Sequence, residues 1–190
     1  KDDPEPPIQI SFSAASISLT EGSQVNVMLQ LSRPAAREGS VHIVLTGDAV
    51  YTADYNTNPS GISGSIDVIF TEGATTHVIT VATVNNEFYS SNKTVILTLQ
   101  DPAPGYLIGA TNEITLFIEE DEGPAIANFQ FSTGSVSESS VSGLVMQIPF
   151  SGPAQGPGSV TITWASNNAA YESNFTTLPA AAGHTISYAI

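Results

Sequence analysis

Cysteine is absent from this sequence of 190 residues. Disulfide bonds, thiolate nucleophiles and zinc-thiolate sites are therefore excluded. Basic residues are almost absent too, since four Lys and Arg stand against 18 Asp and Glu and the formal net charge is −14. A surface with this charge repels phosphate backbones and anionic lipid headgroups, so we expect no nucleic-acid partner and no direct binding to a membrane surface.

Enzyme motifs and membrane spans are also missing. The patterns HExxH, GxSxG and GxGxxG and the P-loop do not occur, and no serine stands in a motif that marks an activated nucleophile. No stretch approaches the length needed to span a bilayer. We therefore expect a non-enzymatic protein, with an uncatalogued hydrolase as the enzymatic alternative.

What the sequence does contain is alternation of apolar and polar residues. In QVNVMLQL, residues 24–31, the apolar side chains fall on one face of a strand and Gln24, Asn26 and Gln30 fall on the other. The same period recurs around Val41, Ile66, Val95 and Ile114, with turn signals between the runs and no helical period anywhere. This pattern predicts an all-β chain folded as a sandwich.

A second feature is an internal repeat. SISLTEGS, residues 16–23, recurs as GSVSESS at 134–140, and YTADYNT, residues 51–57, recurs as YESNFTT at 171–177. We therefore predict an N-terminal tether over 1–7, a complete domain over 8–121, a linker over 122–125 and a second, truncated domain over 126–190. The tether KDDPEPP is similar to the mature start of an exported bacterial lipoprotein.

The order of motifs resembles the Calx-beta domain family. The matching features are Glu21-Gly22, Asp54-Tyr55, the strand-and-turn IFTEGATTHVITV from Ile69, the hairpin VILTLQDPAPGYLIG from Val95, and the final strand ITLFIEED from Ile114. The resemblance implies two tandem immunoglobulin-like antiparallel β-sandwiches, and a calcium site at the end of the first one. Six residues are the implied metal ligands: Glu21, Asp54, Asn86, Glu87, Glu120 and Asp121.

Two departures from the family pattern weaken the expected calcium site. Asn85-Asn86 stands where calcium-binding members carry paired aspartates, and Lys93 stands where they carry a glutamate. Strand alternation over Glu119 to Glu122 predicts that at most two of these four acids face one site. The alternatives are a solvated acidic linker for this run, and ordinary turn chemistry for Glu21 and Asp54.

For function, we expect an extracellular or cell-surface module used in adhesion or structural spacing, in the context of a lipid-anchored bacterial surface protein. The alternative is a carbohydrate- or peptide-binding sandwich whose loop aromatics bind the ligand: Tyr51, Tyr55, Phe88, Tyr89 and Tyr106. Alignment of Gly183 with Gly73 places Ile190 opposite Thr80 and leaves residues 81–121 without a counterpart. Residues 160–165 are then expected at an open sheet edge, completed by neighbouring domains of a longer protein or by a second copy of the chain.

Overall fold

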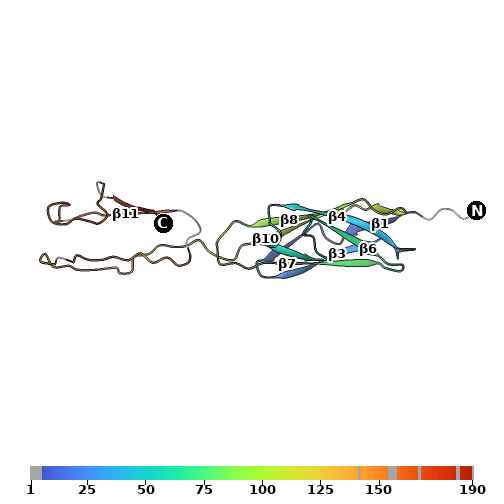
Figure 1. The fold of residues 1–190 in the computed structure, drawn as a ribbon, viewed down its shortest axis with the longest axis horizontal. Helices are drawn as coiled ribbons and strands as arrows, with labels where there is room; N and C mark the ends of the chain where they lie inside the picture. The colour runs from blue at the N-terminus through green and yellow to red at the C-terminus, as the bar shows by residue number, and fades with distance from the viewer. Residues whose placement is uncertain (1–5, 141, 154–157, 167, 183–184, 190) are drawn as a thin grey trace, which may run out of the picture. The chain divides into compact units, whose positions relative to one another are not determined.

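The computed structural model describes residues 6–140, 142–153, 158–166, 168–182 and 185–189. It divides into two compact units, Lys1–Glu122 and Gly123–Ile190, which are called unit 1 and unit 2 below (Figure 1). Most of the expected tether lies outside the described residues. Within those residues, no helix has the length and apolar character needed to cross a membrane.

Unit 1 is built from two five-stranded sheets. The first has the order β5-β7-β3-β1-β9 and the second has the order β2-β10-β8-β4-β6. The first sheet contains β1 (Ile8–Phe12), β3 (Gln24–Leu31), β5 (Tyr55–Asn58), β7 (Thr76–Thr83) and β9 (Tyr106–Ile108). The second contains β2 (Ser16–Thr20), β4 (Gly39–Gly47), β6 (Ser65–Phe70), β8 (Lys93–Gln100) and β10 (Glu113–Glu119). All neighbours pair antiparallel except β1 with β9 and β10 with β2, which are parallel. The predicted all-β sandwich is confirmed, with these two parallel pairs added.

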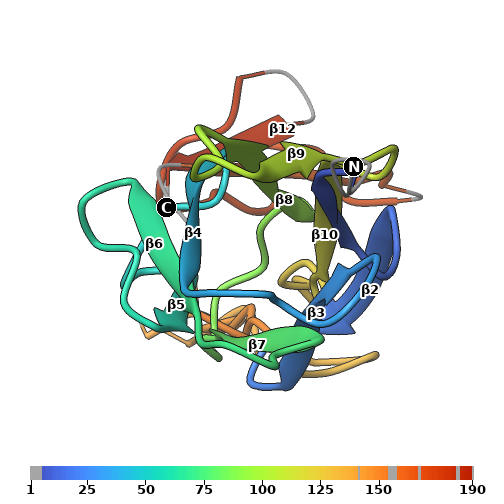
Figure 2. The ribbon, with the colours of Figure 1, turned by 90° about the vertical axis from the view of Figure 1, so that its right-hand side faces the viewer.

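The alternating residues form the core between the sheets. On β3, Val27 and Leu29 are fully buried while Gln24 and Gln30 are exposed, as the sequence pattern predicts. Val41 and Ile43 on β4 are buried in the same way from the second sheet. Figure 2, which looks along the strands, shows both sheets around this core. Each fully buried aliphatic side chain of this size contributes about 1.5–3 kcal/mol to folding, so the core fixes the register of every strand.

Parallel pairing of β2 with β10 brings two distant acids to one end of unit 1. The register places Thr20 opposite Glu119, so Glu21 and Glu120 follow side by side. The backbone N–H of Glu21 donates to the carbonyl of Glu119 at 3.2 Å. On the other side of β10, Lys93 at the start of β8 pairs with Ile118. The fold therefore gathers Glu21, Lys93 and Glu120 at the same end of the second sheet.

In unit 2, β11 (Ser159–Thr163) and β12 (Thr185–Ala189) form a two-stranded antiparallel sheet. Ile162 pairs with Ile186 in this sheet, just as Ile43 pairs with Ile66 between β4 and β6. β12 is therefore the counterpart of β6, and the expected alignment of the chain's last residues with Thr80 on β7 is wrong. Gly183, on which that alignment rested, lies outside the described residues.

The loop between these paired strands repeats in detail. The Tyr51 hydroxyl accepts the N–H of Gly61 at 3.1 Å, and the Tyr171 hydroxyl accepts the N–H of Ala181 at 2.9 Å. Thr52 and Glu172 both have positive φ, at 69° and 67°. Conserved backbone geometry at a spacing of 120 residues shows that the sequence repeat is also a structural one.

Candidate metal centre

Glu21 forms the buried part of an acidic cluster at the end of unit 1. Glu21 directly follows β2 and is 8% exposed. Its Oε2 accepts a hydrogen bond of 2.6 Å from the Asn86 side-chain amide. Burial raises the pKa of the Glu21 carboxyl, and the charges of Glu120 and Asp121 raise it further, against the opposing effects of Asn86 and Lys93. The site therefore holds a carboxylate whose negative charge is not fully compensated.

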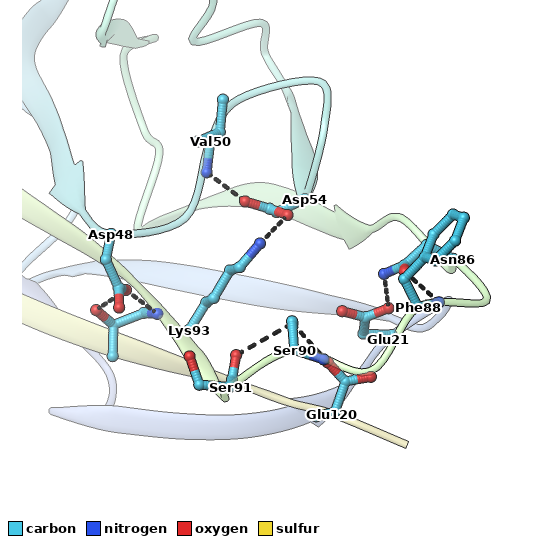
Figure 3. Close-up of polar contacts among 11 residues, drawn as sticks. Glu21, Asp48, Val50, Asp54, Asn86, Phe88, Ser90, Ser91, Lys93 and Glu120 are labelled. Atoms are coloured by element: carbon cyan, nitrogen blue, oxygen red, sulfur yellow. Dashed lines mark hydrogen bonds and ion pairs between the residues drawn. The ribbon is translucent and has the colours of Figure 1, made fainter. Parts of the chain in front are cut away.

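Glu120 lies beside Glu21 and is held by the loop that precedes β8. Its Oε2 accepts hydrogen bonds from the backbone N–H and the hydroxyl of Ser90, at 2.6 and 2.5 Å. Its own N–H donates to the Asn92 side chain at 3.0 Å. Burial acts to raise the pKa of Glu120, but hydrogen bonds from Ser90 and Glu122 outweigh it and lower that pKa to about 2. Glu120 is thus a fixed and ionised carboxylate (Figure 3).

Asp121 and Glu122 complete the cluster. Each of Glu21, Glu120, Asp121 and Glu122 offers one carboxylate oxygen, and these atoms all lie within 4.8 Å of one another. Strand β10 ends at Glu119, so the alternation of a strand does not extend to the residues after it. The expectation that at most two acids of this run face one site is therefore wrong, because three do so.

Glu122 contributes an unsatisfied carboxylate oxygen to the cluster. Its Oε2 is shielded from solvent and has no hydrogen-bond partner within the described residues. The hydrogen bond with the Glu120 carboxyl raises the pKa of Glu122 to about 7, and burial and Asp121 act in the same direction. Proton uptake by Glu122 and cation binding are two ways to relieve the same repulsion.

Asp54 does not join the cluster. Its Oδ1 lies 2.5 Å from the Lys93 ammonium, and its Oδ2 accepts the backbone N–H of Val50 at 2.6 Å. The residue is 8% exposed, so this ion pair is largely sheltered from water. Figure 3 shows Lys93 reaching Asp54 on the side of the site away from Asn86 and Phe88. Asp54 thus acts as a turn residue and as the partner of Lys93.

Asn86 and Glu87, like Asp54, do not supply the ligand oxygens that were expected of them. Asn86 contacts the cluster through its amide group, which donates to Glu21, while its Oδ1 accepts the N–H of Phe88 at 2.7 Å. Its oxygen is thus occupied by the loop. Glu87 is exposed and is not one of the four clustered acids. Of the six residues expected as ligands, the structure brings together the carboxylates of Glu21, Glu120 and Asp121.

Three contributors were missed by the reasoning from sequence. Glu122 was assigned to a linker, although it stands within the same acidic run as Glu120. Ser90 stands in no motif, and Asn92 begins the N-x-T pattern Asn92-Lys93-Thr94, which does not point to a role in holding Glu120. The only sequence signal for that role is the position of both residues just before β8, opposite the end of the final strand of unit 1.

The donor set is suited to a hard divalent cation. Calcium takes six to eight oxygen ligands at about 2.3–2.6 Å, mostly from carboxylates, carbonyls and water. The four carboxylates supply much of this set, and Glu122 Oε2 supplies an oxygen that no group among the described residues satisfies. These residues therefore fit calcium, although Asn86 contributes no charge and Lys93 holds a positive charge close by.

The loop aromatics do not form one exposed surface. Tyr55 and Tyr106 are each 4% exposed and belong to the core, whereas Phe88 and Tyr89 are about half exposed. Tyr51 packs edge-on against Tyr55, with ring centroids 5.2 Å apart. A sugar or peptide platform made from all five aromatics is therefore excluded in unit 1.

Comparison with known proteins shows which solved structures this fold resembles. No protein-family model matches the sequence, and no curated protein matches it. Among solved structures, the apo form of the Calx CBD1 domain matches at 14% identity and a TM-score of 0.52, over 61% of this chain and 99% of that domain. The tandem CBD12 of CALX1.2 matches at 15% identity and a TM-score of 0.53, over 82% of this chain. The calcium binding domain CBD12 of CALX1.1 matches at 12% identity and a TM-score of 0.51, also over 82% of this chain.

The chain spans 55% and 57% of the two tandem structures. At these identities the likeness concerns the fold. It agrees with the resemblance drawn from the order of motifs in the sequence, and with the structural repeat of unit 1 in unit 2. The chain therefore has the fold of the Calx-beta domains, in a tandem arrangement.

Proposed function

We propose that this chain is a non-enzymatic module of an extracellular or cell-surface protein, used for adhesion or structural spacing, and that calcium stabilises its unit 1. The observation that carries the proposal is the convergence of four carboxylates at one end of a Calx-beta-type sandwich. A lipid-anchored bacterial surface protein is the proposed context, with neighbouring domains of a longer protein or a second copy of the chain as partners.

Glu21, Glu120, Asp121 and Glu122 hold the cation in this proposal. Bound calcium supplies positive charge that removes the repulsion among the four acids. Glu21 follows β2, while Glu120 to Glu122 follow β10, so a shared cation ties the ends of these two strands together. Ser90 and Asn92 hold Glu120 in place from the loop before β8. The role of the ion is therefore to stiffen one end of the sandwich.

The test is thermal unfolding of the chain in millimolar calcium and in excess chelator. A ligand that binds only the folded state adds about 2.7 kcal/mol at 100 times its dissociation constant, which raises the melting temperature of a domain of this size by several degrees. The variant Glu122→Gln should lose most of this shift. Glu72→Gln is the matched control, because Glu72 is exposed in the turn between β6 and β7 and lies outside the cluster. Identical curves with and without calcium would refute the calcium site and leave a solvated acidic segment.

A further inference from the structure

One contact in unit 1 places an amine against a carboxyl group in a sheltered position. Lys93 Nζ lies 2.5 Å from Asp54 Oδ1, although the two residues are 39 positions apart in the chain. The Asp54 side chain is 9% exposed and that of Lys93 is 28% exposed. Figure 3 shows the Lys93 side chain extended toward the carboxyl group. An amine and a carboxyl group held in this way form an ion pair, and they are also the two reactants of an amide bond.

The carboxyl group of Asp54 is held in one orientation. Its Oδ1 faces Lys93, while its Oδ2 accepts the backbone N–H of Val50 at 2.6 Å. The backbone N–H of Asp54 donates in turn to the carbonyl of Val50 at 2.8 Å, which closes the loop between the two residues. A fixed N–H stabilises a carboxyl oxygen on which negative charge develops. The turn therefore presents Oδ1 to the amine and supports Oδ2 from the other side.

The amine is held by the second sheet. Lys93 is the first residue of β8 and pairs with Ile118 of β10, so its backbone is fixed from the core side. Reactants that are held in contact reach effective concentrations of about 10⁵–10⁸ M. Such concentrations favour the loss of water from a pair that would not condense when its members are free in solution.

We propose that Lys93 and Asp54 are a site of covalent self-modification, at which the two side chains condense to an amide between Lys93 Nζ and Asp54 Cγ with loss of one water molecule. The proposal goes beyond the proposed function and does not depend on calcium binding, because neither residue belongs to the acidic cluster.

The step needs no oxidant, cofactor or other reactant. A proton passes from the Lys93 ammonium to Asp54 Oδ1 across the 2.5 Å contact, which leaves a neutral amine beside a carboxylic acid. The nitrogen lone pair attacks Asp54 Cγ to form the N–C bond, and Oδ2 carries the negative charge while the N–H of Val50 stabilises it. A second proton passes from the nitrogen to Oδ1, the Cγ–Oδ1 bond breaks, and Oδ1 leaves as water. Oδ2 remains as the amide oxygen.

The new bond joins the two sheets of unit 1. Asp54 directly precedes β5 in the first sheet, and Lys93 begins β8 in the second. A cross-link between positions far apart in the chain restricts the unfolded state and so favours the folded one. The freshly folded chain holds the ion pair and the amide forms from it, so unfolding measurements on the ion pair belong to the chain before reaction.

The test is the intact mass of the folded full chain, followed by trypsin digestion after unfolding. The folded chain, kept for several days at neutral pH, should lose the mass of one water molecule. Lys93 is the one Lys or Arg after Arg37, so the unreacted chain gives the fragments 38–93 and 94–190. Trypsin does not cleave after a lysine whose amine is in an amide. The reacted chain should therefore give a single fragment, 38–190, that is lighter by one water molecule.

A second digestion locates the bond. Cleavage after glutamate separates residues 39–72, which contain Asp54, from residues 88–113, which contain Lys93. In the reacted chain these two peptides should stay together, with the sum of their masses less one water molecule. Fragmentation of this branched product should place the link between residues 54 and 93.

Lys93→Arg is the matched control. The guanidinium keeps the positive charge beside Asp54, but it lacks the amine that forms this amide, so the variant should keep its full mass and be cleaved after residue 93. Its thermal transition reports that unit 1 is folded. The unmodified chain kept in denaturant for the same time is a control that needs no variant, because unfolding separates the two side chains.

Two results would overturn the proposal. The folded chain could keep its full mass and be cleaved completely after Lys93, which would leave the pair as an ion pair only. A loss of water could also occur equally in Lys93→Arg or in the unfolded chain, which would place the reaction elsewhere.

Discussion

Lys93 and Asp54 form an ion pair of 2.5 Å at the same end of unit 1 as the acidic cluster, but outside it. The Asp54 side chain is 9% exposed and that of Lys93 is 28% exposed, so both charges are substantially removed from water. Lys93 also lowers the pKa of Glu21, although its effect there is smaller than that of burial. One lysine therefore neutralises a buried aspartate and partly offsets the charge of the neighbouring acids.

The first prediction concerns the cost of breaking this pair. Lys93→Met leaves Asp54 buried without its counter-charge and should lower the free energy of unfolding of unit 1 by about 3 kcal/mol. The double variant Lys93→Met with Asp54→Asn should regain most of this loss, because Asn174 already occupies the equivalent position in unit 2. There the Asn174 side chain accepts the N–H of Ala170 at 2.8 Å, as Asp54 accepts that of Val50. Chemical denaturation of the unmodified chain and of the two variants decides it, and equal loss in the single and double variants would contradict it.

The second prediction is that Lys93 and Asn86 weaken the calcium site. The double variant Lys93→Glu with Asn86→Asp adds two carboxylates near a cluster that already contains four. The side-chain nitrogen of Asn86 lies 2.6 Å from Glu21 Oε2. Calcium affinity should therefore rise, while the metal-free form loses stability through repulsion. Calorimetric titration measures the first effect and melting in chelator measures the second.

Glu38→Asp with Glu72→Asp is a control with the same number of changes and no change of charge, and both residues are exposed. An unchanged calcium affinity in the charge-adding variant would show that its two positions do not contact the cation.

Much of the fold could be predicted from the sequence because a buried strand leaves a period of two. Val27 and Leu29 on β3 are fully buried as that period requires. The period fails after Glu119, where β10 ends and the backbone turns Glu120, Asp121 and Glu122 toward one another. Alternation is a property of extended backbone, and it carries no information about the residues that follow a strand.

Other features were beyond sequence reasoning for a different reason. Asp54 was expected to bind metal, but which partner a buried carboxylate takes depends on the register of β8, which places Lys93 within reach. The alignment of the last residues of the chain on Gly183 was wrong because a single glycine turn recurs in many β-hairpins. The pairing of Ile162 with Ile186 identifies β12 as the counterpart of β6.

The third prediction concerns the repeated tyrosine loop. The Tyr51 hydroxyl accepts the N–H groups of Thr57 and Gly61, at 3.2 and 3.1 Å. Tyr51→Phe removes this acceptor from the Thr57 N–H, while the Gly61 N–H keeps its bond of 2.8 Å to Thr57 Oγ1. The variant should lower the free energy of unfolding of unit 1 by about 1–3 kcal/mol. Tyr171→Phe removes the equivalent hydroxyl from unit 2 and serves as the matched control, because it should leave the unfolding transition of unit 1 unchanged. An equal effect of both variants on unit 1 would contradict this.

The last prediction is the pH dependence of metal-free unit 1. The pKa of Glu122 is raised from its ordinary value of 4.5 to about 7, so the folded form holds this proton more tightly than the unfolded form. This stabilisation is fully present below pH 4.5 and is lost as the pH rises through 7. The pKa of Glu120 is lowered to about 2, so its contribution is present above pH 4.5 and is lost as the pH falls toward 2. In chelator, the melting temperature of unit 1 should therefore fall as the pH rises from 5 to 8. It should also fall as the pH is lowered below 4.5.

Calcium should reverse the upper part of this profile, because the cation and the proton compete for the same carboxylates. The calcium-dependent rise in melting temperature should accordingly be larger at pH 8 than at pH 5. Glu122→Gln mimics the protonated side chain, so in chelator it should remove the part of the decline between pH 5 and pH 8 that Glu122 causes while leaving the loss below pH 4.5. Melting curves recorded across this range, with Glu72→Gln as the control, measure both effects. A decline that persists unchanged in Glu122→Gln would assign the titration to another group and separate Glu122 from the site.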